Sequence, residues 1–264
     1  MVVLLYKAVN RWVNIVLCVL LALVPACGIP PKPDTLPIRP DLQQECMRWS
    51  SAVIVSHKPN WKPQLQIGKH GFAIPAHAEA GSATPVSSDG YFLSAHHVIE
   101  GYLDCTIFVW YGGDSGWRKA RLVWSDEAAD LVLLHVDMKT SGHYRWSDPD
   151  EWLSAGMKVF HVGIATGSEM MVGKVLTDLR PEPRWGGGNR MFKMDLPLKP
   201  GDSGGAVLDR HGNLVGINSA VEYLVPMETA FFVDSEASRP NIRKIKDIIR
   251  LDRRQNHAMS AVAN

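Results

Sequence analysis

The sequence predicts an all-β protein that ends in one amphipathic helix, and three observations lead to this prediction. Short apolar runs rich in β-branched residues recur along the chain, each bounded by Gly, Asp, Ser or Asn. The 22 glycines and 17 prolines are spread along the chain, which suits many short strands joined by turns. Residues 240–250 (PNIRKIKDIIR) place isoleucines at helical spacing with charges between them. With 264 residues, the chain is long enough for one or two packed units.

Residues 1–27 are predicted to be a secretory signal peptide. Lys7 and Arg11 form a basic start, and the apolar run over residues 15–24 is shorter than a membrane span normally requires. We therefore expect the protein to be exported, to the periplasm or the cell surface.

Cys27 gives this signal a second interpretation. The stretch Val24-Pro25-Ala26-Cys27-Gly28 resembles the cleavage box of bacterial lipoproteins, in which the cysteine becomes the lipidated first residue, although proline is unusual at the place of Pro25. The alternative is an ordinary signal peptide whose cysteine has no role. If Cys27 is lipidated, the proline-rich residues 28–47 would be a stiff linker to the membrane.

The part of the chain over residues 48–138 is expected to form the first group of strands. Its apolar runs are compact and are separated by turn residues. The expected strands cover residues 51–56, 91–94, 106–111, 120–124 and 131–136. Residues 139–151 are polar, lack sustained periodicity and are the expected linker between two halves.

The second half, residues 152–238, repeats this pattern. The expected strands cover residues 158–163, 171–177, 191–196, 206–208, 214–219 and 230–233. Strands at this spacing indicate a sandwich or barrel. Residues 239–254 are expected to form the closing helix, whose charged face is more commonly a solvated surface than a membrane contact.

Composition excludes several classes of function. The formal charge is +1, from 28 basic and 27 acidic residues, whereas nucleic-acid binding usually needs a basic surplus. The sequence has neither a CxxC nor an HExxH motif, so we expect no metal site and no cofactor. Cys46 and Cys105 are compatible with one disulfide or with two free thiols.

The strongest chemical signal is the run Pro200-Gly201-Asp202-Ser203-Gly204-Gly205. A serine hydroxyl is a weak nucleophile unless a neighbouring base takes its proton. The oxyanion formed when the serine attacks an amide also needs preorganised N–H donors. A glycine two places before the serine allows a turn in which the N–H groups of Gly201 and Ser203 converge. We therefore interpret Ser203 as a nucleophile and these two N–H groups as its oxyanion hole.

A base and an acid with suitable surroundings occur earlier in the chain. His96 and His97 follow the apolar run Tyr91-Phe92-Leu93-Ser94 after Ala95, and Asp130 directly precedes the run Leu131-Val132-Leu133-Leu134. With these motifs, the order His, Asp, Ser resembles the chymotrypsin–trypsin clan of serine proteases. The division of roles among the three residues follows the well-known triad template of that clan.

Within this clan the chain is most similar to the Deg-type (HtrA) bacterial proteases. The resemblance covers about residues 50–235 and includes Gly81-Ser82-Ala83, Asp89-Gly90-Tyr91-Phe92-Leu93-Ser94, Met171-Val172-Gly173-Lys174-Val175 and the stretch from Gly212 to Val221. It implies two antiparallel six-stranded β-barrels with the active site in the cleft between them, and a protein or peptide substrate.

The resemblance also assigns the individual residues. Relatives carry the catalytic histidine just before an apolar pair, so the match falls on His97 rather than His96. Asp130 matches the acid that orients the histidine, although Asp126 and Glu127 lie close by. The implied activity is that of a serine-type endopeptidase acting through an acyl-enzyme on Ser203.

Two features depart from the Deg-type pattern. Those proteases usually carry a PDZ domain after the protease, and fewer than 30 residues follow Ser235, so no such domain is expected. They also tend to have Asn where this chain has Asp202. In digestive trypsin-like enzymes an Asp at this place pairs with an N-terminus released by activation cleavage. No Arg-Ile-Val-Gly-Gly stretch is present to supply one, so Asp202 needs another partner or solvent.

The resemblance places the primary specificity pocket at Pro197 and at Ser219, Ala220 and Val221. Pro197 lies at the base of the pocket, where no Asp is available to attract Lys or Arg. Val221 stands where digestive enzymes have a glycine that opens the pocket. We therefore predict cleavage after small or medium apolar residues.

Two other functions use the same residues. A protease-fold binding protein could retain the triad and yet lack activity if the loop around Ser203 failed to form the oxyanion hole. An esterase could use the same triad, but the GxSxG motif of α/β-hydrolases is absent and their triad order differs.

Overall fold

The computed structural model describes residues 41–58, 60–64, 73–100, 105–112, 114–165, 169–182, 188–224 and 231–262. All of these residues belong to one compact unit, Lys32–Asn264. The expected signal peptide and Cys27 lie outside the described residues.

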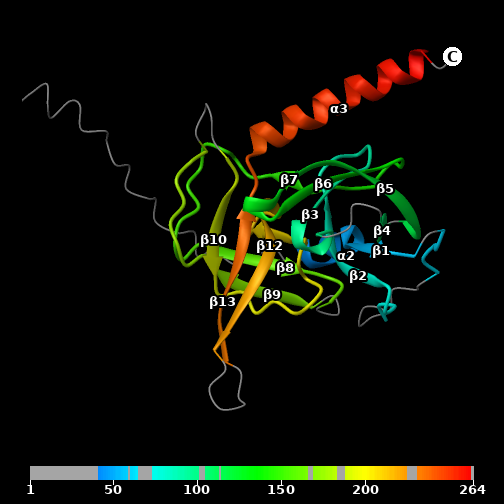
Figure 1. Ribbon diagram of the computed structural model, residues 1–264. Helices are drawn as coiled ribbons and strands as arrows, with labels where there is room; N and C mark the ends of the chain where they lie inside the picture. Colours follow the sequence, from blue (N-terminus) through cyan, green and yellow to red (C-terminus); the bar gives the residue numbers. More distant parts are fainter. Residues whose placement is uncertain are drawn as a thin grey trace, which may run out of the picture. The chain divides into compact units, whose positions relative to one another are not determined.

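The first group of strands closes into a barrel, drawn from blue to green in Figure 1. Its strands are β1 (Ser51–Ser56), β2 (Ala78–Pro85), β3 (Tyr91–Ser94), β4 (Thr106–Tyr111), β5 (Asp114–Asp126) and β6 (Leu131–Val136). They pair antiparallel in the order β1-β2-β3-β6-β5-β4, and β4 closes the ring by pairing with β1. The interior is filled by apolar side chains such as Val53, Phe92, Val109 and Leu134. A barrel with this few strands is narrow enough for side chains to fill its interior, so it contains a packed core rather than a channel.

The second group forms a seven-stranded sheet in the order β10-β13-β12-β11-β8-β9, with the short β7 beside β12. Its strands are β7 (Arg145–Trp146), β8 (Lys158–Val162), β9 (Met170–Lys174), β10 (Arg190–Met194), β11 (Ala206–Asp209), β12 (Asn213–Leu224) and β13 (Phe231–Arg239). A bridge between Val175 and Met194 joins the ends of β9 and β10, so the two edges of this sheet meet over a short stretch.

A second apolar cluster connects the two strand groups with both α-helices. It contains Leu93 and Leu133 from the first barrel and Phe160 and Leu208 from the second sheet. Leu42 and Cys46 of helix α2 (Leu42–Trp49) and Ile245 and Ile249 of helix α3 (Ile242–Val262) belong to the same cluster. Burying apolar area in this shared cluster stabilises the whole arrangement, including the seam where the site lies.

Helix α3 is also fixed to the first barrel by polar contacts. Asp252 accepts a hydrogen bond from the Tyr91 hydroxyl at 2.8 Å and is bound by both terminal nitrogens of Arg121 at 3.0 and 2.7 Å. Arg253 binds Asp89 through two hydrogen bonds of 2.7 and 2.6 Å. Such bidentate arginine–carboxylate pairs are among the stronger polar contacts in proteins.

The prediction of an all-β fold with a C-terminal helix is confirmed, and α3 extends to Val262, beyond the expected end. Two strands and one α-helix were not anticipated: β2, the two-residue β7 and helix α2, which includes residues of the expected proline-rich linker. Cys46 and Cys105 are both free thiols. In the part of the chain that the structure describes, no helix is long and apolar enough to cross a membrane.

Candidate active site

His97 lies on a short 3₁₀ helix, His96–Val98, that directly follows strand β3. Strand β3 is completely buried and fixes the start of this turn, and Val98 packs into the barrel interior. The His97 side chain itself remains 45% exposed, so its ring can be reached from solvent.

Asp130 holds His97 at two points. Its Oδ2 lies 2.8 Å from His97 Nδ1, and its Oδ1 accepts a 2.8 Å hydrogen bond from the backbone N–H of His97. Because a carboxylate only accepts hydrogen bonds, Nδ1 carries the proton and Nε2 is left free to act as a base. The hydrogen bond to Asp130 is the main cause that raises the pKa of His97 above its usual value.

The conformation of Asp130 directs its side chain toward the histidine. The 3₁₀ helix Glu127–Ala129 ends at Asp130, which adopts a left-handed conformation with φ 49°. Such a conformation is uncommon for a residue with a side chain and is found most often at turns and functional sites. The neighbouring Asp126 instead caps this 3₁₀ helix by accepting from the N–H of Ala129.

Ser219 connects Asp130 with the serine turn. Its hydroxyl donates a hydrogen bond to Asp130 Oδ2, and its backbone carbonyl accepts a 3.2 Å hydrogen bond from the Ser203 hydroxyl. Burial disfavours the charged form of Asp130, but the hydrogen bonds from His97 and Ser219 outweigh burial and lower its pKa. Asp130 is therefore held as a carboxylate at neutral pH.

The turn that carries Ser203 depends on two glycines with left-handed backbone angles. Gly201 has φ +99° and Gly204 has φ +88°. A side chain at Gly204 would place its Cβ 2.1 Å from the Ser82 carbonyl oxygen, so this position has no room for one. Gly201 is needed for its angle, which residues with a Cβ adopt only at an energetic cost.

Two backbone N–H groups of this turn are available to a ligand. Among the described residues, neither the N–H of Gly201 nor that of Ser203 donates a hydrogen bond to the protein, whereas the N–H of Asp202 binds the carbonyl of Lys199 at 2.9 Å. Unpaired N–H groups on a serine and on the residue two places before it are suitable donors for an oxyanion hole.

Strand β2 of the first barrel fixes the serine turn of the second sheet. Ser82 donates from its backbone N–H to the Ser203 carbonyl at 2.8 Å and from its hydroxyl to the Gly201 carbonyl at 2.7 Å. The Thr84 hydroxyl donates to the Gly204 carbonyl at 2.9 Å. These hydrogen bonds bring the serine turn to the same seam as His97.

The structure does not place the proposed triad in one continuous hydrogen-bonded line. His97 and Asp130 are in contact, but within the described residues no hydrogen bond joins the Ser203 hydroxyl to His97, because this hydroxyl points to Ser219. Catalytic hydrogen bonds are often long or misdirected in the absence of substrate and tighten when it binds.

The expected specificity residues differ in their surroundings. Pro197 is exposed, Ser219 is 9% exposed, and Ala220 is exposed at the surface of strand β12. The backbone of Val221 pairs with Ser235 of β13, whereas its side chain lies outside the described residues. The expected effect of Val221 on the pocket therefore stays a prediction.

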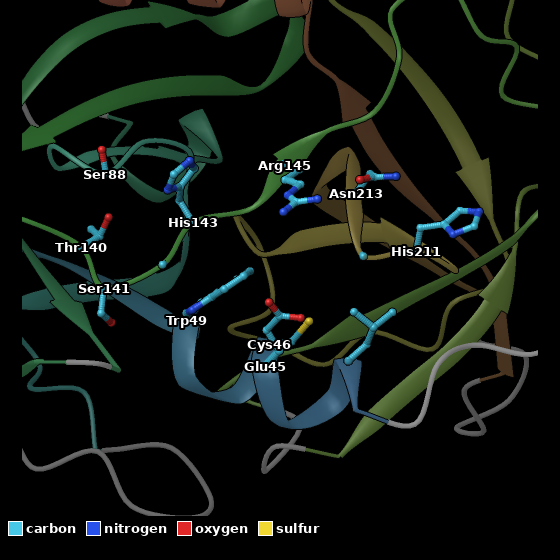
Figure 2. A pocket seen from close by; sticks show the side chains of 13 residues that line it. Glu45, Cys46, Trp49, Ser88, Thr140, Ser141, His143, Arg145, His211 and Asn213 are labelled. Carbon is cyan, nitrogen blue, oxygen red and sulfur yellow. The ribbon is translucent and has the colours of Figure 1, made fainter.

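A separate cavity of about 610 Å³ lies against helix α2. Figure 2 shows Glu45, Cys46 and Trp49 of this helix facing Arg145 and His211 across the cavity. Burial is the main cause that lowers the pKa of His143, which also lines it. None of His97, Asp130 and Ser203 contributes to this lining, so this cavity is distinct from the candidate active site. No metal-binding cluster of His, Cys, Asp and Glu occurs among the described residues.

The fold and these residues define a protein class. The family model of the trypsin-like peptidase domain matches residues 81–217, just over half of the chain. The chain therefore belongs to the family of trypsin-like peptidase domains.

Several curated relatives are similar to this chain over part of their length. A probable periplasmic serine endoprotease, DegP-like, from Pseudomonas putida (strain W619) is 27% identical over 173 residues, which cover 60% of this chain and 35% of the relative. The magnetosome formation protease MamE from Paramagnetospirillum magneticum is 27% identical over 158 residues, covering 57% of this chain and 21% of that protein. The chain thus spans about a third of the length of its DegP-like relatives.

Solved structures agree with the fold. The HtrA-type protease AlgW with a decapeptide matches with a TM-score of 0.56 and 22% identity, over 80% of this chain and 67% of that chain. AlgW with a tripeptide matches with a TM-score of 0.55 and 23% identity, over 78% of this chain and 60% of that chain. The predicted resemblance to the Deg-type proteases is confirmed by the DegP-like relatives.

The sequence did not predict two side-chain contacts at this site, one made by Ser219 and one made by Asp202. Ser219 was expected only to line the substrate pocket, yet its hydroxyl binds Asp130. Asp202 was left without a partner, and the structure places His161 beside it. Neither contact has a local sequence signal, because each joins residues that are far apart in the chain.

Proposed function

We propose that this protein is a serine endopeptidase that cleaves protein or peptide substrates through an acyl-enzyme on Ser203. The observation that carries this proposal is the double attachment of His97 to Asp130, beside a serine turn with two unpaired N–H groups. This arrangement supplies a base in the correct tautomer and donors for a developing negative charge.

The proposed reaction begins when the Ser203 hydroxyl turns from the Ser219 carbonyl toward His97. Nε2 of His97 accepts the hydroxyl proton while Oγ attacks the substrate carbonyl. Asp130 stabilises the imidazolium that forms, and the N–H groups of Gly201 and Ser203 bind the oxyanion. His97 then gives the proton to the leaving amine, and a water molecule hydrolyses the acyl-enzyme through the same steps.

The substrate specificity that we propose is for small or medium apolar residues before the cleaved bond. Pro197, Ser219, Ala220 and Val221 would line the primary pocket, and none of these side chains carries a charge that would attract Lys or Arg. Hydrolysis of a panel of peptides that differ only at this position tests the proposal, and a preference for Arg or Lys would contradict it.

We also propose export, followed by attachment to a membrane through Cys27. The support is the signal-like sequence of residues 1–27, together with the printed description of the DegP-like relatives as periplasmic. Metabolic labelling with a fatty-acid analogue, compared with the Cys27→Ala variant, distinguishes lipidation from ordinary cleavage.

A second candidate function is that of a protease-fold binding protein without activity. One observation favours it, because the Ser203 hydroxyl donates to the Ser219 carbonyl rather than to His97. In this function the turn would bind a peptide without acylation.

The deciding experiment measures casein hydrolysis and labelling by a fluorophosphonate, beside a Ser203→Ala control. We expect both activities in the unaltered protein and a loss of several orders of magnitude in the variant. A folded protein that shows neither activity would favour the binding function. Labelling without casein cleavage would indicate a reactive serine with a narrow substrate range.

A further inference from the structure

Asp202 is completely buried and organises the turn that carries the proposed nucleophile, Ser203. Its side chain is 0% exposed. Oδ2 accepts a 2.8 Å hydrogen bond from the N–H of Lys199, the backbone N–H donates to the Lys199 carbonyl, and the backbone carbonyl accepts from Gly205. Asp202 therefore connects both ends of the turn, between which Gly201 and Ser203 present their N–H groups.

His161 is the basic side chain that meets the remaining oxygen of Asp202. It comes from strand β8, its side chain is 1% exposed, and its Nε2 lies 3.2 Å from Asp202 Oδ1. The contact has the distance of an ion pair but not the angles of a hydrogen bond, and neither atom has another hydrogen-bond partner among the described residues. The two groups thus depend on each other.

The other ring nitrogen of His161, Nδ1, has two polar neighbours. Nδ1 of His161 lies 2.9 Å from the backbone carbonyl of Ala206, and the side-chain amide of Asn218 lies 3.1 Å from the same nitrogen. A carbonyl only accepts hydrogen bonds and an amide NH₂ group only donates them, so Nδ1 satisfies either Ala206 with a hydrogen or Asn218 with its lone pair, but not both. In either case the contact between Nε2 and Asp202 Oδ1 is favourable only when a proton lies between these two atoms.

The surroundings leave space for this pair and for little else. A Cβ at Gly163 would lie 2.2 Å from His161 Nε2 and 2.6 Å from Asp202 Oδ1. A Cβ at Gly205 would lie 2.5 Å from His161 Cε1. Two glycines thus allow the backbone to close around the ring and the carboxylate, which excludes solvent from both.

We propose that His161 is a positioning residue for the serine turn, an inference that rests on the proposed peptidase function. By holding Asp202 inside the fold, His161 keeps the N–H groups of Gly201 and Ser203 directed at the oxyanion. A carboxylate buried without a partner is strongly unfavourable. Without His161, the turn would rearrange to bring Asp202 to water, and the oxyanion donors would be lost.

Three variants of the full-length protein test this proposal. His161→Leu leaves the buried carboxylate without its basic partner. We expect kcat to fall about 100-fold or more, with KM changed less than about threefold, because oxyanion donors act mainly in the transition state. Asp202→Asn should keep kcat within about tenfold, since its amide oxygen can accept from Lys199 and its NH₂ group can donate to neutral His161. The double variant His161→Leu/Asp202→Asn buries no charge and should be at least about tenfold faster than His161→Leu.

His135→Leu is the matched control. His135 lies on strand β6, and its Nε2 contacts the carbonyl of Asp89 at 3.1 Å, away from the serine turn. The kcat of His135→Leu should stay within about threefold of that of the unaltered protein, because the substitution removes one hydrogen bond that lies away from the serine turn.

A second measurement does not depend on activity. Hydrogen exchange followed by mass spectrometry reports the amides of residues 199–205, and exchange there should become at least about tenfold faster in His161→Leu and recover in the double variant. This result in a protein that lacks peptidase activity would refute the proposed function and leave the positioning role standing. Unchanged exchange in His161→Leu, or a double variant no better than His161→Leu by either measurement, would overturn the positioning role. If His161→Leu does not fold, recovery of folding in the double variant supports the proposal, and failure of both contradicts it.

Discussion

The substitution Asp130→Asn reverses the direction of a hydrogen bond at the centre of the proposed site. Asp130 accepts from three donors: the backbone N–H of His97, its ring Nδ1 and the hydroxyl of Ser219. An asparagine has only one oxygen, and the backbone N–H can only donate, so the amide oxygen stays opposite this N–H. The NH₂ group then faces Nδ1, which must give up its hydrogen and move it to Nε2. A protonated Nε2 cannot accept the proton of Ser203.

The size of this effect follows from the tautomer. The template triad loses about 10⁴ in kcat for the equivalent change, which corresponds to about 5.5 kcal/mol of transition-state stabilisation. We expect a loss of this order in peptide hydrolysis and a parallel loss in the rate of fluorophosphonate labelling. Circular dichroism and the melting temperature show whether the variant remains folded.

Ser219→Ala is the matched control for this argument. It removes one hydrogen bond from Asp130 but leaves the carboxylate and both contacts to His97 in place. Because the half-buried carboxylate can recruit water in place of the Ser219 hydroxyl, we expect transition-state stabilisation to fall by about 1–2 kcal/mol. This corresponds to a roughly 5–30-fold lower kcat. If Asp130→Asn lowered the rate no more than Ser219→Ala, the tautomer argument would be refuted.

Three further outcomes are expected. Activity should rise with pH through the pKa of His97, at a pH above the ordinary 6.5 because its carboxylate partner raises that pKa, and a pH–rate profile flat from about pH 5 to 9 would exclude His97 as the base. Gly204→Ala would place a Cβ 2.1 Å from the Ser82 carbonyl oxygen, so labelling should be lost and the melting temperature should fall, whereas an unchanged melting temperature would contradict the described turn. Asp252→Asn should lower the free energy of unfolding by about 1–2 kcal/mol and the melting temperature by about 2–8 °C. Since Arg121 lowers the pKa of Asp252, this stabilisation is present above the ordinary carboxyl pKa and is lost as the pH falls through the lowered value, so melting curves of both proteins should converge in acid.

The strands of this fold could be predicted wherever β-branched or aromatic residues dominate. Residues 51–56, 91–94, 106–111 and 131–136 are strands with the predicted bounds. Strand β2 was missed because its sequence, AEAGSATP, is rich in residues with low strand propensity. Pairing with β1 and β3 stabilises it in spite of that composition.

Helix α2 was missed for a related reason. It is only eight residues long, and its burial depends on Leu42 and Cys46 packing into the shared cluster. A helix this short has little stability of its own, so its formation depends on tertiary contacts that the sequence does not display.

The candidate site was predictable to the extent that local motifs mark it. The turn around Ser203 and the surroundings of His97 and Asp130 are continuous stretches of sequence. The contact between Asp202 and His161, in contrast, joins the serine turn to strand β8, and these lie far apart in the sequence. A lone histidine in a strand has no pattern that indicates such a partner, so only the folded chain reveals the pair.

The hydrogen bonds from strand β2 to the serine turn have a consequence for engineering. Ser82 and Thr84 bind the carbonyls of Gly201, Ser203 and Gly204 across the seam. A chimera that combined this first barrel with the second barrel of a distant relative would inherit a turn fitted to a different strand. Transplanting β2 together with the turn should preserve that fit, so the exchangeable module of this protein crosses the boundary between its first barrel and its second sheet.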